Sequence, residues 1–224
     1  MPGGWTMSMM WMRMPGQTWF TSAGMFLLMW LAMMVAMMLP SAMPMLGHCH
    51  RCLKSGGMVS AGAATMLVAC GYFAVWTVIG LVMYLVGVSW AYATMQWSGL
   101  SRAVPAMVGA TLVVSGGIQF SRWKMDALKR CRDPLTYAAL KTVGAGKNAW
   151  WHGLSQGVSC AICCSGPMLA LLALGAMNLT VMVVVALQIA MERLAPKPDL
   201  LLRLSGTVAI IIGAAKMFRP VFLP

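Results

Sequence analysis

Three cysteines lie close together in one apolar stretch of the sequence, SCAICCSGPM at residues 159–168. If this stretch is an α-helix, Cys160, Cys163 and Cys164 share one face, because positions i, i+3 and i+4 are neighbours on a helix. Met168 adds a fourth sulfur atom one turn further on. Soft metal ions such as Cu(I) prefer thiolate and thioether ligands. The spacing therefore predicts a soft-metal site on this helix.

Two other interpretations of these cysteines stay open. Cysteine is a small side chain that is often buried, so the three thiols could simply pack in a core. C-x-x-C is also the pattern of thiol redox proteins, so a membrane thiol relay is a further interpretation. Pro167 removes the backbone hydrogen bond to the carbonyl of Cys163, and Gly166 precedes it. We therefore expect a kink that opens space around the sulfur atoms.

Methionine is concentrated near the N-terminus, where the first 45 residues hold 14 of the 25 methionines. The segment TMSMMWMRMPG at residues 6–16 alternates methionine with small and aromatic residues. Such a segment could collect Cu(I), or it could lie on the membrane surface with methionine as flexible apolar filler.

The first long apolar stretch also carries methionines at a spacing of four residues. They form two adjacent ladders, Met25, Met29, Met33 and Met37 in one and Met34 and Met38 in the other. We predict that Met34, Met37 and Met38 are metal ligands facing the cysteine stripe, whereas packing or lipid contact is the ordinary alternative. Pro40 and Pro44 follow, and we expect them to disturb the backbone at this depth.

A second group of ligand-type residues follows in the segment HCHRC. Its members are His48, Cys49, His50 and Cys52. Imidazole and thiolate within five residues can share Zn(II) or copper, so this segment is a second candidate metal site. Short clusters of this kind also arise by chance.

Further candidates lie in and beside the later apolar stretches. Cys131 stands among Lys129, Arg130 and Arg132, which either favour a metal-binding thiolate or form a solvated basic stretch. Glu192 is an acid within an apolar stretch, where a carboxylate is a functional candidate. It could be a ligand, or it could form a pair with Arg193 at the membrane interface. In addition, we expect Gln119 to bond across helices and Asn178 to cap a helix.

Composition determines the class of protein that positions these residues. Of the 224 residues, 60% are hydrophobic and 9% are charged, whereas a soluble domain has about a quarter charged residues. Apolar runs long enough to cross a bilayer recur along the chain. We predict an all-α, polytopic transmembrane bundle with about six spans: 24–46, 61–88, 103–120, 154–176, 179–194 and 201–217. Residues 1–23 form an outer Met- and Trp-rich segment, and residues 24–224 form the membrane domain.

The positions of the basic residues predict an orientation. The first, third and fifth connections hold two, seven and three Lys and Arg residues, twelve of the 16 in the chain. Basic residues favour the cytoplasmic side, so the long basic loop at 121–153 is predicted to face the cytoplasm and both termini to lie outside. The net charge of +12 is therefore expected to set topology and contact anionic lipid rather than nucleic acid.

Together these motifs resemble one known family. The residues that carry the resemblance are MMVAMMLPSAMPM in the first span, C-R-x-P in the basic loop, G-x-x-C-x-x-C-C-x-x-x-M in the fourth span, G-x-M-N-L after it, and Glu192. The family is domain-of-unknown-function family 2182, bacterial integral membrane proteins predicted to bind metal. It implies ligand positions at Met37, Met38, Cys131, Glu192 and the cysteine stripe, and a location in the bacterial inner membrane.

The sequence departs from that family at two positions. Ala127 stands where members have a second loop cysteine, and Ser165 stands where an aromatic residue is expected. The Met-rich N-terminus and HCHRC are additions that favour copper.

The leading functional hypothesis is a membrane protein that binds Cu(I) and hands it on, with zinc as the alternative metal. A membrane copper enzyme or a copper chaperone would be its partner. The second hypothesis is a non-catalytic accessory or assembly subunit of a larger membrane metalloenzyme, in a homo- or hetero-oligomer. No catalytic constellation is recognised.

Overall fold

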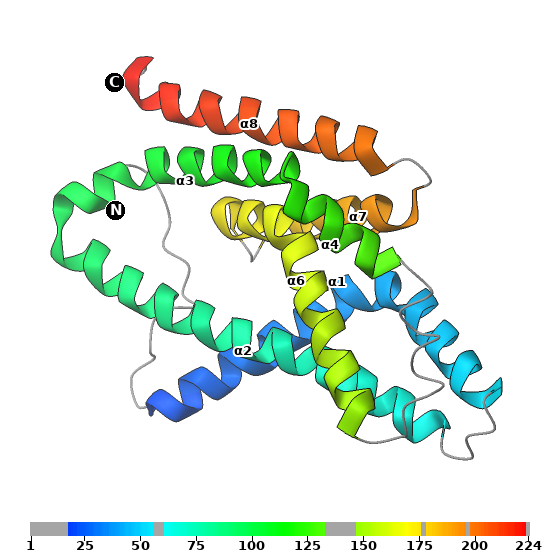
Figure 1. Cartoon of the computed structure of the whole chain (residues 1–224). Helices are drawn as coiled ribbons and strands as arrows, with labels where there is room; N and C mark the ends of the chain where they lie inside the picture. The colour runs from blue at the N-terminus through cyan, green and yellow to red at the C-terminus, as the bar shows by residue number, and fades with distance from the viewer. Residues whose placement is uncertain (1–17, 56–60, 133–146, 176–177, 196–197, 223–224) are drawn as a thin grey trace.

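Every regular element that the structure describes is an α-helix, as composition and periodicity predict. The structure is a computed structural model that describes residues 18–55, 61–132, 147–175, 178–195 and 198–222. In chain order the helices are α1 (Trp19–Ser55), α2 (Ala61–Gln96), α3 (Ser98–Gln119), α4 (Arg122–Arg132), α6 (Lys147–Leu174), α7 (Leu179–Leu194) and α8 (Pro198–Phe222) (Figure 1). The Met-rich segment 6–16 lies outside the described residues.

Each of the six predicted spans corresponds to one helix, but not every helix has membrane length. Among the described residues, four stretches are long and apolar enough to cross a bilayer: Trp19–Pro40, Ala61–Gln96, Asn148–Leu174 and Pro198–Met217. The third predicted span qualifies only together with α4, across a bend of 63°. Helix α7 has 16 residues, about 24 Å of helix against a hydrocarbon core of about 30 Å. The number of six spans stays a prediction.

Several predicted boundaries are corrected by the structure. Helix α1 continues to Ser55, so the HCHRC segment is helical rather than part of a loop. Helix α6 starts at Lys147, and α4 lies inside the stretch 121–153 that was expected to be one long loop. These segments are polar enough to interrupt an apolar run, yet nothing in them prevents helical backbone geometry.

The prolines within the spans do not end the helices that contain them. Helix α1 contains Pro40 and Pro44, helix α6 contains Pro167, and each remains one helix. The ribbons of α1 and α6 do change direction along their length (Figure 1). Proline is the usual cause of such bends, because it removes one backbone hydrogen bond and crowds the preceding turn.

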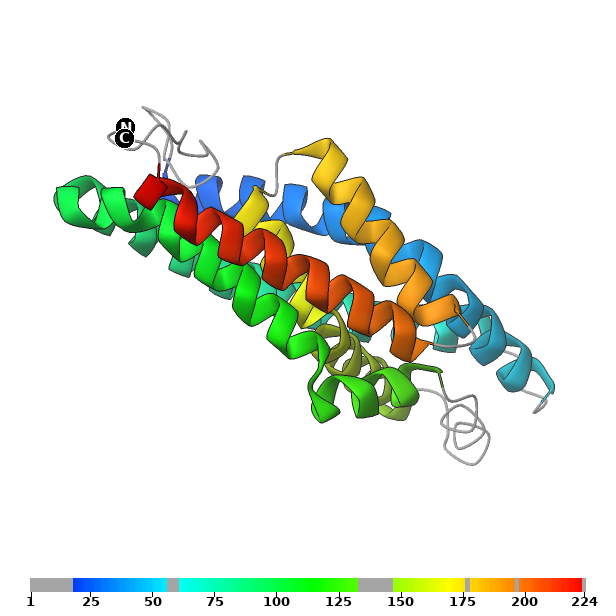
Figure 2. The ribbon, with the colours of Figure 1, turned by 90° about the horizontal axis from the view of Figure 1, so that it is seen from above.

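Glycines bring α3 and α8 together as an antiparallel pair. A side chain at Gly109 would come within 2.7 Å of the Gly213 carbonyl, and one at Gly116 within 2.6 Å of the Gly206 carbonyl. Small residues at these crossing points let two backbones approach closely, as is common between membrane helices. Seen from above, the pair forms one side of the bundle, with α1 and α7 on the other (Figure 2).

A second close crossing joins α2 to α6. A side chain at Gly71 would come within 2.6 Å of the Trp150 carbonyl, and one at Gly153 would collide with the carbonyl of Val68. Helix α6 also packs against α3, α4 and α7. It is therefore the central helix of the bundle, and its cysteine stripe lies in the core.

Candidate metal centre

The three cysteines of α6 are buried together in the main apolar core. Cys160, Cys163 and Cys164 are each 1–2% exposed, and all are free thiols. The sulfur atoms of Cys160 and Cys164 are 3.9 Å apart. Two metal–thiolate bonds have a length of about 2.3 Å each. One ion can therefore bind both sulfur atoms if it lies beside the line that joins them, with a bent sulfur–metal–sulfur angle.

A fourth thiol reaches this stripe from another helix. Cys131, near the end of α4, is partly buried and packs against the core that holds Cys160, Cys163 and Cys164. Ala127 and Leu128 form the buried face of α4 that packs there. The basic residues Lys129 and Arg130 point to the opposite, exposed face. The amphipathic pattern of α4 thus turns Cys131 inward, and the expectation of a solvated basic stretch holds only for the outer face.

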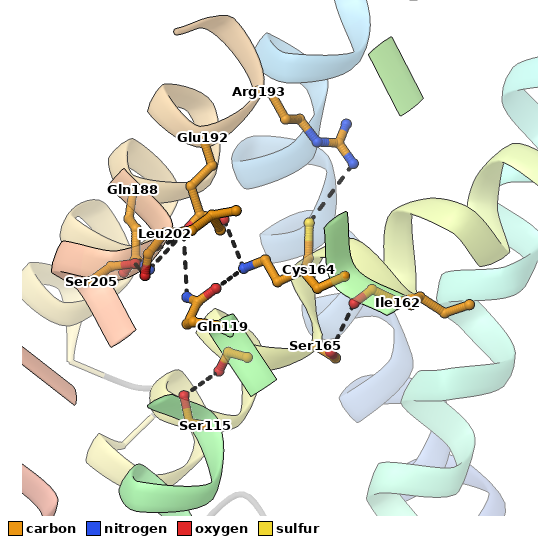
Figure 3. A network of polar contacts seen from close by, with 12 residues as sticks. Ser115, Gln119, Ile162, Cys164, Ser165, Gln188, Glu192, Arg193, Leu202 and Ser205 are labelled. Carbon is orange, nitrogen blue, oxygen red and sulfur yellow. Dashed lines mark hydrogen bonds and ion pairs between the residues drawn. The ribbon is translucent and has the colours of Figure 1, made fainter. Parts of the chain in front are cut away.

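Two side chains that sequence reasoning did not place at the site contact the thiols. The Tyr72 hydroxyl lies 2.9 Å from the Cys160 sulfur, where the glycine crossing of α2 and α6 positions it. Arg193 of α7 donates from Nη2 to Cys160 at 2.6 Å and to Cys164 at 3.8 Å, and Figure 3 shows the second of these contacts. A cation beside thiols favours their anionic, metal-binding form.

The methionines are only partly arranged as the ladders predicted. Met34, Met37 and Met38 are at most 4% exposed and belong to the same buried cluster as the α6 thiols and Met168. Met29 and Met33 pack partly buried against this cluster, whereas Met25 is 64% exposed. A spacing of four residues drifts around a helix of 3.6 residues per turn, so one ladder cannot face one neighbour along its whole length.

Glu192 belongs to a different network from the thiols. Its carboxylate accepts from Lys124 Nζ at 2.8 Å, Gln119 Nε2 at 3.3 Å and Gln188 Nε2 at 3.0 Å. Lys124 also donates to Gln119. Of the two interpretations of Glu192, the pair with Arg193 is wrong, because consecutive residues on α7 point to different neighbours (Figure 3). Gln119 does bond across helices, as predicted.

The HCHRC segment lies apart from the thiols. Cys49 is fully buried in a second cluster with Leu53 and Val68, whereas His50 is exposed and His48 is intermediate. Its predicted role as a metal site stays a prediction. Elsewhere, Asn178 caps α7 as expected, since its side chain accepts from the backbone N–H groups of Thr180 and Val181.

Within the described ranges, no three His, Cys, Asp or Glu side chains are grouped as a ready cage for a metal ion. The Cys160 and Cys164 sulfur atoms are 3.9 Å apart, and Cys131 packs against the same core from α4. Thiolate sulfur is a ligand of both Cu(I) and Zn(II).

A comparison with protein-family models identifies the chain's relatives. The model described as PpoB2, copper chaperone, matches residues 27–216. The chain belongs to this family of copper chaperones. No curated protein and no solved structure matches the chain.

Membership in the copper chaperone family supports the prediction that this protein handles copper. The matched range includes all four thiols of the cluster and the buried methionines of α1, and it leaves out residues 6–16.

The residues missed by sequence reasoning had weak signals. Arg193 directly follows the one acid of its span, which suggests an ion pair between the two as one interpretation, and Tyr72 is an ordinary aromatic residue in an apolar run. Lys124 belongs to a basic segment whose helical phase decides which cations are buried. Among these signals, only the amphipathic pattern of α4 allows the buried face of that helix to be predicted from the sequence.

Proposed function

We propose that this copper chaperone family member is a multi-pass protein of the bacterial inner membrane that binds Cu(I) within its helix bundle and hands it to an acceptor. The observation that carries the proposal is the gathering of Cys131 from α4 with Cys160, Cys163 and Cys164 from α6 in one buried cluster. Family membership supports copper as the cargo.

The methionines supply weaker ligands on one side of the thiols. Met34, Met37 and Met38 come from α1, and Met168 comes from the thiol helix itself. Thioethers are neutral and thiolates are anionic, so affinity for a monovalent cation rises from the methionines to the cysteines. Cu(I) entering along α1 would therefore move toward the thiols.

Cys131 is the best placed thiol for release. It is partly buried, whereas the three α6 thiols are at most 2% exposed. Thiol-to-thiol exchange moves a soft ion without releasing it into water. An acceptor that offers a thiol or thioether near the end of α4 would take the ion from Cys131. The acceptor is proposed to be a membrane copper enzyme or a copper chaperone.

The membrane topology is part of the proposal. Apolar helices of membrane length and the basic third connection support a bundle whose termini lie outside and whose α4 lies at the cytoplasmic side. Arrival at the Met-rich outer segment and release beside α4 then give an inward direction of transfer.

The proposal is tested by copper content. The full chain, purified in detergent and loaded anaerobically with Cu(I), is expected to retain stoichiometric copper through dialysis. The triple variant Cys160→Ser, Cys163→Ser, Cys164→Ser is expected to lose it. Cys70→Ser is the matched control, because Cys70 is exposed on α2. Equal copper content in the triple variant and the wild type would show that copper does not bind at these cysteines. Retention of zinc in place of copper would favour the alternative metal.

A further inference from the structure

Tyr72 is a buried side chain of α2 that offers a hydroxyl group to the thiol cluster. Its hydroxyl oxygen lies 2.9 Å from the Cys160 sulfur, and the residue is 3% exposed. Bulk water therefore does not compete for this hydrogen bond. When Cys160 binds a metal ion, its sulfur is a thiolate without a proton, so the Tyr72 hydroxyl is the donor.

The close packing of α2 against α6 holds this hydroxyl in place. Tyr72 directly follows Gly71 at the glycine crossing, and a side chain at Gly157 of α6 would come within 2.9 Å of the Tyr72 carbonyl. Gly157 lies one turn before Cys160 on the same face of α6. The Tyr72 ring also makes an edge contact with Phe73, with ring centroids 5.2 Å apart. The backbone approach therefore fixes the hydroxyl against one particular sulfur of the stripe.

The hydroxyl distinguishes Cys160 from its neighbour Cys164. Arg193 Nη2 donates to both sulfur atoms, at 2.6 Å to Cys160 and at 3.8 Å to Cys164. Within the residues that the structure describes, the hydroxyl bonded to this pair of thiols is that of Tyr72, and its partner is Cys160. An ion shared by the two sulfur atoms would therefore have one bond to a sulfur that accepts from a hydroxyl.

A hydrogen-bond donor on a metal-bound sulfur helps that sulfur to leave the metal. A thiolate bound to Cu(I) shares its electron pair with the ion and regains its full negative charge when the metal–sulfur bond breaks. A hydrogen bond to an ionised group is stronger than one to a neutral group, so the bond strengthens as this charge develops. The barrier to breaking the metal–sulfur bond is therefore lower than for a sulfur without the donor.

We infer that Tyr72 is a positioning residue for ion release, which makes Cys160 the first sulfur of the pair to release Cu(I). This inference rests on the proposed function. In the step, a thiolate of another cysteine or of the acceptor donates an electron pair to the ion. The bond to Cys160 then breaks, and its electron pair returns to the Cys160 sulfur. Copper stays in the +1 state, and no electron or proton is transferred.

The experiment measures how fast the loaded protein gives Cu(I) to a chelator. The detergent-purified full chain is loaded anaerobically with one equivalent of Cu(I) and mixed with excess bicinchoninate, which forms a coloured Cu(I) complex. Tyr72→Phe removes the hydroxyl and keeps the ring. Because the hydroxyl is not a ligand, we expect the same copper content before mixing and a transfer rate that is lower by about fivefold or more.

Tyr84→Phe is the matched control for this variant. Tyr84 is also a buried tyrosine of α2, and its hydroxyl donates to Ser22 rather than to a thiol. The control therefore loses a hydroxyl hydrogen bond from the same helix and should transfer copper at the wild-type rate. Equal slowing in both variants would overturn the inference, because it would show a general effect of altered packing.

A stronger donor at the same position gives the opposite prediction. Replacement of Tyr72 by 3-fluorotyrosine keeps the hydroxyl and nearly the same shape, and the fluorine makes the phenol a stronger hydrogen-bond donor. Release should then be faster than in the wild type, which a purely structural role does not predict. If Tyr72→Phe is not monodisperse in detergent, this variant decides the matter. Faster release supports the inference, and an equal or lower rate overturns it.

The outcomes separate this inference from the proposed function. A wild-type chain that retains no Cu(I) would overturn the proposed function and the inference with it. If the wild type binds Cu(I) and Tyr72→Phe releases it at the same rate, only the inference about Tyr72 fails.

Discussion

Lys124 and Glu192 form a buried ion pair at 2.8 Å although they are 68 positions apart in the chain. The pair joins α4 to α7 directly beside the thiol cluster. Since Cys131 lies on α4 and Arg193 lies on α7, the pair fixes the two helices that bring these side chains to the cysteines of α6. The pair therefore supports the site, and the role of Glu192 as a metal ligand stays a prediction.

Removing one partner of this ion pair should destabilise the protein more than removing both. Lys124→Met leaves the Glu192 charge buried without its cation, at a cost of about 3–5 kcal/mol. The double variant Lys124→Met, Glu192→Met removes both charges, so the loss should be much smaller. The free energy of unfolding in detergent is the measurement. Lys129→Met, on the exposed face of α4, is the control and should change it by less than about 0.5 kcal/mol. Equal losses in the single and double variants would contradict a buried pair.

The crossing of α2 and α6 should not tolerate a methyl group. Gly153→Ala places a side chain against the Val68 carbonyl, so we expect a loss of about 1–3 kcal/mol in the free energy of unfolding. Gly62→Ala in α2 meets no atom within 4 Å and should be neutral or stabilising. Thermal unfolding of the two variants in the same detergent makes the comparison. A stable Gly153→Ala protein would show that the helices are further apart than described.

Cys131 should be the thiol of the cluster that reacts first with an alkylating reagent. It is partly buried, whereas Cys160, Cys163 and Cys164 are nearly inaccessible. One equivalent of Ag(I) should slow its labelling by N-ethylmaleimide, because the ion occupies the cluster, while labelling of the exposed Cys70 stays unchanged. Mass spectrometry of the labelled peptides gives the rates. Unchanged labelling of Cys131 in the presence of bound Ag(I) would exclude it from the transfer path.

The proposed topology predicts where reporters become active. Alkaline phosphatase fused after residue 224 should be active, since it needs the oxidising outer side, and a fusion within residues 133–146 should be inactive. A cytoplasmic fluorescent reporter should give the opposite pattern. If both results were reversed, the bundle would have the opposite orientation in the membrane, and the proposed direction of copper transfer would be outward.

Much of the fold could be read from the sequence because it depends on local properties. Apolar length and composition predict helices, and all six predicted spans coincide with helices in the structure. The spacing of Cys160, Cys163 and Cys164 predicts their common face for the same reason, since helical periodicity is a property of one segment. The polarity of α4 and of the HCHRC segment predicts connections between spans, but both are helical, because a polar segment can adopt helical geometry as well.

The tertiary structure decided which distant residues meet the thiols. Arg193 pairs with sulfur rather than with Glu192 because neighbouring residues on a helix point about 100° apart, and only the positions of α4 and α6 around α7 decide what each one meets. In the same way, Tyr72 reaches Cys160 because two glycines let α2 approach α6. The sequence by itself determined a set of apolar helices and a stripe of sulfur ligands on one of them. The charge and the fourth thiol of the site depend on helix packing, which no single segment encodes.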